Sequence, residues 1–137
     1  MSTVIDGSAG IIGAPGGLTS AGTTGVGYTT GAGGTVTQAT SKSTAVTLNT
    51  ASGQITMNNA ALAAGVTVQF TLNNSLIGIN DLLLICPNAN TGTGGGYTAI
   101  CSAIAGAGAV IRVTNITGVS LSEAIQLNFA IIKGATT

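Results

Sequence analysis

The chain contains no histidine and no tryptophan, and only 4% of its residues carry a charge. Without histidine it lacks the commonest general acid–base group and metal ligand. The charged residues sum to zero, and they are Asp6, Lys42, Asp81, Arg112, Glu123 and Lys133. Three separated cations cannot neutralise a phosphate backbone, and we therefore expect no nucleic-acid partner.

The remaining reactive groups form no motif. The acids Asp6, Asp81 and Glu123 are far apart in the sequence, so a glycosidase-type carboxylate pair would have to be assembled by folding. Cys86 and Cys101 lack the spacing of a zinc site. The glycine-rich stretch 92–96 lacks the Lys-Ser/Thr pair of a phosphate-binding loop. We predict that the protein is not an enzyme and that it has no cofactor and no metal site.

So little charge also has a consequence for assembly. Copies of a neutral chain repel one another weakly, and its polar surface has to come from Thr, Ser, Asn, Gln and Gly. Association of copies is one interpretation, and a stable monomer with a hydroxyl-rich surface is the other.

The sequence offers no membrane segment. The most apolar long window, Ala99–Ile111, has 13 residues and is too short to span a bilayer. The first residues have no Lys or Arg before their weak apolar patch, which is unlike a secretory signal. We expect synthesis in the cytoplasm, and hence free thiols at Cys86 and Cys101. A disulfide between them is the alternative, if Asp81–Cys86 and Tyr97–Ile104 pair as a hairpin.

Apolar and polar residues alternate in short runs that end at turn residues, which is typical of half-buried strands. The clearest strand is Val66–Leu72, and its alternation predicts that Val66, Val68, Phe70 and Leu72 face inward. The last run is predicted to face inward with Ile125, Leu127, Phe129 and Ile131. Two other runs place Ile55 and Met57, and Ile111 and Val113, on one face each. Asp81–Cys86 is continuously apolar and predicts a strand covered on both faces, and Asn59–Ala64 suits one helical turn. The predicted strands are Thr35–Thr40, Ala45–Asn49, Gln54–Asn58, Val66–Leu72, Asp81–Cys86, Tyr97–Ile104, Ala109–Asn115 and Ala124–Lys133.

About eight short strands at this spacing predict an all-β fold, an antiparallel β-sandwich of jelly-roll type over residues 35–137. Residues 1–34 are rich in glycine and have no strand or helix period. A flexible linker is one interpretation of this segment. We favour an extended arm that contacts another surface, through Ile5, Ile11, Ile12, Leu18, Val26 and Tyr28.

Two stretches of the sequence carry a resemblance. Residues 27–75, GYTTGAGGTVTQATSKSTAVTLNTASGQITMNNAALAAGVTVQFTLNNS, resemble the C-terminal β-module of tailed-bacteriophage fibre and head-decoration proteins. Residues 120–136, SLSEAIQLNFAIIKGAT, resemble the end of the same module. The segment from about residue 80 to 112, which holds both cysteines, resembles it less closely.

The resemblance implies a non-enzymatic, homotrimeric protein of the virion. A short arm before the module fits a capsid decoration (cement) protein, which would bind the major capsid protein on the outer surface of the head. The alternative is a fibre tip that binds a host receptor or glycan through the loops Asn88–Gly96 and Gly118–Ser122. A self-polymerising fibre subunit is a further possibility.

Overall fold

The computed structural model describes residue 23 and residues 26–136. This part of the chain contains eight strands and no helix. The strands are β1 (Thr35–Thr37), β2 (Val46–Thr47), β3 (Ser52–Thr56), β4 (Thr67–Asn73), β5 (Leu82–Pro87), β6 (Tyr97–Ala105), β7 (Gly108–Asn115) and β8 (Gln126–Ile132).

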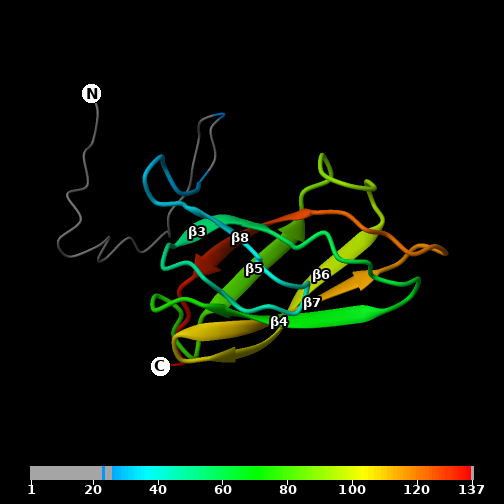
Figure 1. The fold of residues 1–137 in the computed structure, drawn as a ribbon. Helices are drawn as coiled ribbons and strands as arrows, with labels where there is room; N and C mark the ends of the chain where they lie inside the picture. Colours follow the sequence, from blue (N-terminus) through cyan, green and yellow to red (C-terminus); the bar gives the residue numbers. More distant parts are fainter. Residues whose placement is uncertain (1–22, 24–25, 137) are drawn as a thin grey trace.

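The strands form two four-stranded sheets that pack face to face (Figure 1). Sheet A has the order β1-β3-β8-β5, and sheet B has the order β2-β4-β7-β6. The predicted all-β sandwich is confirmed. The sheets are mixed, because β1 runs parallel to β3 and β2 runs parallel to β4, while the other pairs are antiparallel. Among the described strands, β6 and β7 are the only consecutive pair joined as a hairpin.

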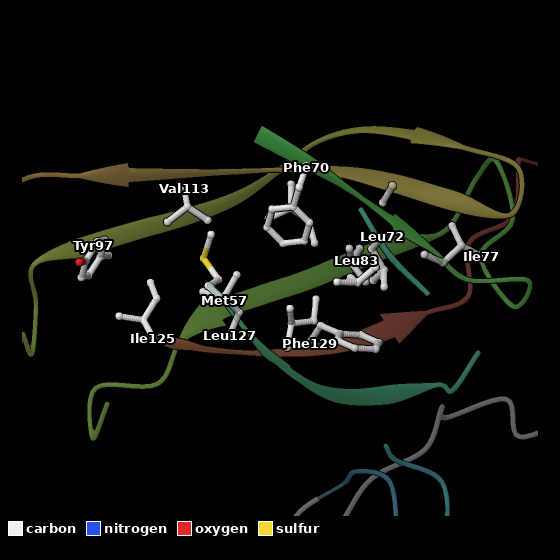
Figure 2. Packing of buried hydrophobic residues seen from close by; sticks show 14 of the residues in the cluster. Met57, Phe70, Leu72, Ile77, Leu83, Tyr97, Val113, Ile125, Leu127 and Phe129 are labelled. Carbon is white, nitrogen blue, oxygen red and sulfur yellow. The ribbon is translucent and has the colours of Figure 1, made fainter. Parts of the chain in front are cut away.

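One hydrophobic core fills the space between the sheets (Figure 2). The predicted alternation is confirmed along β3, β7 and β8 and directly beside them, because the residues predicted to share a face are buried together. These residues are Ile55, Met57, Ile111, Val113, Ile125, Leu127, Phe129 and Ile131. Tyr97 and Ile125 lie at one end of the core, and Ile77 lies at the other (Figure 2).

Several local predictions were wrong. The segment 59–64 forms no helical turn, because Leu62 pairs with Leu121 in an isolated antiparallel bridge. Val66 was expected inside but is exposed, since it follows the turn at Gly65 and the strand begins one residue later. The first two strands are also shorter than predicted, at three and two residues.

A buried polar cluster explains why β1 ends early. The Gln38 side chain donates to the carbonyls of Lys42 and Thr44, and its own oxygen accepts from the Asn58 amide. Lys42 lies in the turn that follows this segment, and its side chain is buried although it carries a charge. Its Nζ donates to the carbonyls of Asn58 and Glu123. Burial lowers the pKa of Lys42. These bonds satisfy buried polar groups that would otherwise cost free energy.

Two buried asparagines brace opposite ends of the sandwich. Asn115 is fully buried, and its Nδ2 donates to the carbonyls of Leu62 and Val119, each at 2.8 Å. Its Oδ1 accepts from the backbone and hydroxyl of Thr117. Asn74 donates to the carbonyl of Thr50 in the same manner. The loops that follow β4 and β7 are therefore fixed by side chains from the strand ends.

Candidate interaction surface

The outer face of sheet A carries no charged residue in any of its strands. In register across β5 and β8, Leu82 lies opposite Ile132, Leu84 opposite Ala130, and Cys86 opposite Asn128. The exposed fractions of Leu82, Leu84 and Ile132 are 60%, 55% and 48%. The face continues over β3 and β1 with hydroxyl and amide side chains, which are Ser52, Gln54, Thr56, Thr35 and Thr37. The half of sheet A formed by β5 and β8 is therefore an uncovered apolar strip.

A shallow hollow of about 400 Å³ lies in this strip, between β5 and β8. Leu84 and Cys86 border it on one strand, and Asn128 and Ala130 border it on the other. The hollow exists because Ala130 is small while its neighbour across the ladder, Leu84, protrudes into solvent. The face thus carries a ridge of leucines directly beside a depression.

This arrangement corrects the prediction for Asp81–Cys86. The apolar run was expected to be covered on both faces, but Leu83 is buried while Leu82 and Leu84 are exposed. β5 is the last hydrogen-bonded strand of sheet A, and β6 of sheet B lies beside it, so the uncovered side of β5 is its outer face. The strands β5 and β8 carry no charged side chain on this face.

The outer face of sheet B has a different chemistry. Its rows across β4, β7 and β6 place Thr67 beside Thr114 and Thr98, and Gln69 beside Arg112 and Ile100. The hydroxyls of Thr67 and Thr114 lie 2.8 Å apart and bond to each other. Hydroxyls, an amide and one guanidinium surround Ile100, which is 56% exposed, whereas Leu82, Leu84 and Ile132 are exposed together on the outer face of sheet A. The two outer faces of the sandwich are therefore not equivalent.

Two of the predicted arm residues lie in the described part of the chain. Val26 is exposed, and Tyr28 is half exposed. The Tyr28 hydroxyl donates to the backbone carbonyl of Ile131 in β8. Ile5, Ile11, Ile12 and Leu18 lie outside the described residues. The arm therefore joins the sandwich beside the end of β8 that carries Ile132.

The two cysteines do not face each other across a hairpin. Cys86 is on β5 and exposed, and Cys101 is on β6 and partly buried. The predicted hairpin of Asp81–Cys86 with Tyr97–Ile104 is wrong, because β5 pairs with β8 in sheet A and β6 pairs with β7 in sheet B. Both thiols are free, and burial raises the pKa of the Cys101 thiol.

The loops Asn88–Gly96 and Gly118–Ser122 lie at the same end of the sandwich (Figure 1). A backbone bond from Ile116 to the Gly96 carbonyl joins their bases. Glu123 holds the first loop, since its carboxylate accepts from the Thr93 amide at 2.9 Å and the Thr93 hydroxyl at 2.7 Å. These hydrogen bonds lower the pKa of Glu123. Glu123 therefore braces this loop.

Tyr97 is the first residue of β6 and directly follows the same loop. Its side chain is buried, and its hydroxyl has no hydrogen-bond partner among the described residues. Burial raises the pKa of Tyr97 to about 12, and the nearby Glu123 carboxylate adds to the shift. Tyr97 also lines a hollow of about 180 Å³ together with Cys86, Thr93 and Ile125. This volume is below the range of typical small-molecule pockets.

The acids in the described part of the chain form no catalytic pair. Asp81 precedes β5 and is bound by Lys133, at 2.6 Å, and by the amides of Gly78 and Gly134. Glu123 precedes β8, which is antiparallel to β5, so the two acids lie at opposite ends of sheet A. Six residues of strand separate them by about 20 Å. Glycosidase carboxylates lie within about 10 Å of each other.

The described residues contain no cluster of three or more metal-ligating side chains. Within the same part of the chain, no helix has the length and apolarity needed to cross a membrane. Comparison with family models, curated proteins and solved structures finds no match for this chain.

Proposed function

We propose that this chain is a structural protein of a tailed-phage virion, namely a homotrimeric decoration protein. It would bind the outer capsid surface beside the major capsid protein and stabilise the head. The observation that carries the proposal is the uncharged, partly apolar outer face of sheet A. The resemblance of residues 27–75 and 120–136 to phage decoration and fibre modules supports the same assignment.

The construction of the sandwich suits this role. Buried side chains such as Gln38, Asn74 and Asn115 fix the loops at the strand ends, so the domain is internally braced. A cement protein acts by adding contacts between capsid subunits, and it needs a rigid body with adhesive surfaces and no reactive group. The protein would be made in the host cytoplasm and would end on the outside of the virion.

The N-terminal arm is the second element of the proposal. Residues 1–22 contain Ile5, Ile11, Ile12 and Leu18 and only one charge, on Asp6. Fully extended, such a segment spans at most about 80 Å. It therefore has the reach to contact capsid or a neighbouring subunit from its junction at Tyr28.

Cryo-electron microscopy of purified virions tests the proposal directly. Density for this chain at regular three-fold positions on the shell is the expected result. Density confined to the tail or to fibre ends would contradict it.

Binding of the full chain to undecorated heads tests the arm. Changing Ile11→Asp together with Ile12→Asp should abolish co-sedimentation with heads. The control, Ser8→Asp with Ser20→Asp, adds the same charge to the same segment without removing an apolar side chain. Equal loss in both variants would refute a specific role for the isoleucines.

A fibre tip that binds a host receptor or glycan is the second candidate. It is favoured by the two adjacent loops at one end of the sandwich, where Ile116 and Val119 are exposed. A glycan array probed with the full chain would show selective binding if this function holds. Loss of that binding in a Val119→Asp variant would locate the contact in the loops, and a blank array would count against the candidate.

A further inference from the structure

We infer that the outer face of β5 and β8 is the surface through which copies of this chain associate. The face is defined by Leu82, Leu84, Ala130 and Ile132, and it includes the hollow floored by Ala130. The inference rests on the proposed function only in expecting an oligomer. It adds the surface and the partner, which is a second copy of the same chain.

The first argument is the cost of leaving this face uncovered. Leu82 and Leu84 are each more than half exposed on a face whose strands carry no charge. A contiguous exposed apolar patch of this kind favours association unless something covers it. The outer face of sheet B has one exposed large apolar residue in its strands, Ile100, and Arg112 and threonine hydroxyls lie beside it. The larger uncovered apolar patch is therefore on sheet A.

The second argument concerns charge. Neither strand of the face carries a charged side chain, so association desolvates no ion. The nearest charges are Lys133 and Asp81, which lie just beyond the strand ends and neutralise each other at 2.6 Å. A partner that docks through charged side chains would find no opposite charge on this face. A second copy presents the same uncharged face, so neither copy buries an unpaired charge.

The third argument is shape. The leucine ridge of β5 and the hollow over Ala130 lie side by side on one surface. A copy related by a three-fold axis can therefore place its Leu84 in the hollow of one neighbour, while its own hollow receives Leu84 of the third copy. A surface that carries the knob and the hole side by side allows such a head-to-tail ring to close.

The reactivity of the Cys86 thiol can report whether this face is covered. Its thiol is exposed on the same face, opposite Asn128, and it borders the hollow. Association through this face covers Cys86. Because coverage by a second copy is lost on dilution, reactivity of Cys86 should rise as the protein is diluted. Coverage by the arm of the same chain would protect Cys86 equally at every concentration.

The experiment uses the full chain and two matched variants. Leu84→Glu places a charge in the face, and Ile100→Glu places the same charge on the outer face of the other edge strand, β6. The two positions are exposed to the same degree, at 55% and 56%. Light scattering coupled to size exclusion should show a multiple of the 13.1 kDa chain mass for the wild type and for Ile100→Glu. Leu84→Glu should weaken association by at least about 30-fold, because it buries an unpaired charge.

Maleimide labelling in a Cys101→Ser background gives the second measurement. Cys86 should be protected in the concentrated wild type and reactive in Leu84→Glu, while circular dichroism shows both folded. A wild type that is monomeric at every concentration overturns the inference, as does a Leu84→Glu variant that associates like Ile100→Glu. Concentration-independent protection of Cys86 would assign the cover to the arm and also overturn it. None of these results depends on capsid binding, so failure here leaves the virion proposal to be decided by microscopy.

Discussion

Gly92 is the residue whose replacement best tests how the loop Asn88–Gly96 is held. Its φ is +68°, in the left-handed region that disfavours side chains. A Cβ at this position would come within 2.7 Å of both Glu123 Oε2 and Ile125 Cγ2. Gly92→Ala therefore strains the backbone and also pushes on the carboxylate that binds Thr93.

Gly95 separates these two effects. It has nearly the same φ, +72°, but a Cβ there would meet nothing within 4 Å. A left-handed alanine costs about 1–2 kcal/mol. Alanine restricts the unfolded chain more than glycine does, and this effect offsets about 0.4–1 kcal/mol of that cost. Gly95→Ala should therefore lower the unfolding free energy by about 1 kcal/mol. Crowding against a packed neighbour adds about 1–3 kcal/mol, and Gly92→Ala should therefore lose about 2–4 kcal/mol.

Urea denaturation of the two variants measures the difference in unfolding free energy. Amide hydrogen exchange at Thr93 gives a local readout, because that amide donates to Glu123. Protection of Thr93 should fall in Gly92→Ala and persist in Gly95→Ala. Equal destabilisation of both variants, with Thr93 protected in each, would show that the contact between Glu123 and the loop contributes nothing.

Three further predictions concern single residues. Ala107 has a φ of +67° in the β6–β7 turn, so Ala107→Gly should raise the unfolding free energy by about 0.5–1 kcal/mol; a destabilised Ala107→Gly in urea denaturation would refute this. Asn115→Ala removes four hydrogen bonds and should cost about 2–4 kcal/mol by thermal denaturation, and a loss below 1 kcal/mol would contradict the bracing role. Hydrogen bonding to Lys133 and neighbouring amides lowers the pKa of Asp81 from 3.8 to about 2. Its stabilisation is therefore present above about pH 4 and lost as the pH falls towards 2, and Asp81→Asn should flatten the dependence of the urea midpoint on pH over that window.

Alternation of apolar residues predicted the core well, for a simple reason. In β8 the residues Leu127, Phe129 and Ile131 recur every second position, and only one face of a strand can point inward. The same rule placed Ile111 and Val113 together on one face of β7, and both are buried. It says nothing about strand direction, and the parallel pairing of β1 with β3 could not be inferred from it.

Polar residues that fold inward were missed because a polar residue usually lies at the surface. Lys42 and Asn115 are buried where loops leave the strands and need backbone carbonyls to be satisfied. A signal for Asn115 is present in the sequence, since Asn followed two residues later by Thr117 is typical of a turn closed by the asparagine side chain. Lys42 gives no comparable signal, because its two acceptors come from residues 58 and 123.

The candidate surface was only half predictable. The apolar run in β5 signals burial on both faces, and the sandwich buries only Leu83 and, in part, Ile85. The second covering layer is absent from the described fold of one chain. An apolar run typical of burial on both faces, on a strand with one face uncovered, is the sequence feature that supports the proposed contact between copies at this face.

The placement of the charges leads to the same conclusion by a separate path. Of the five charged residues in the described part of the chain, Lys42 is buried, Asp81 and Lys133 neutralise each other, and Glu123 is bound to the loop. Only Arg112 extends from the outer face of a sheet. Charge here serves to fasten loops and contributes little to keeping copies apart. A molecule with weak charge repulsion between copies and with exposed leucines favours association. Among the described residues, the β5–β8 face combines both properties.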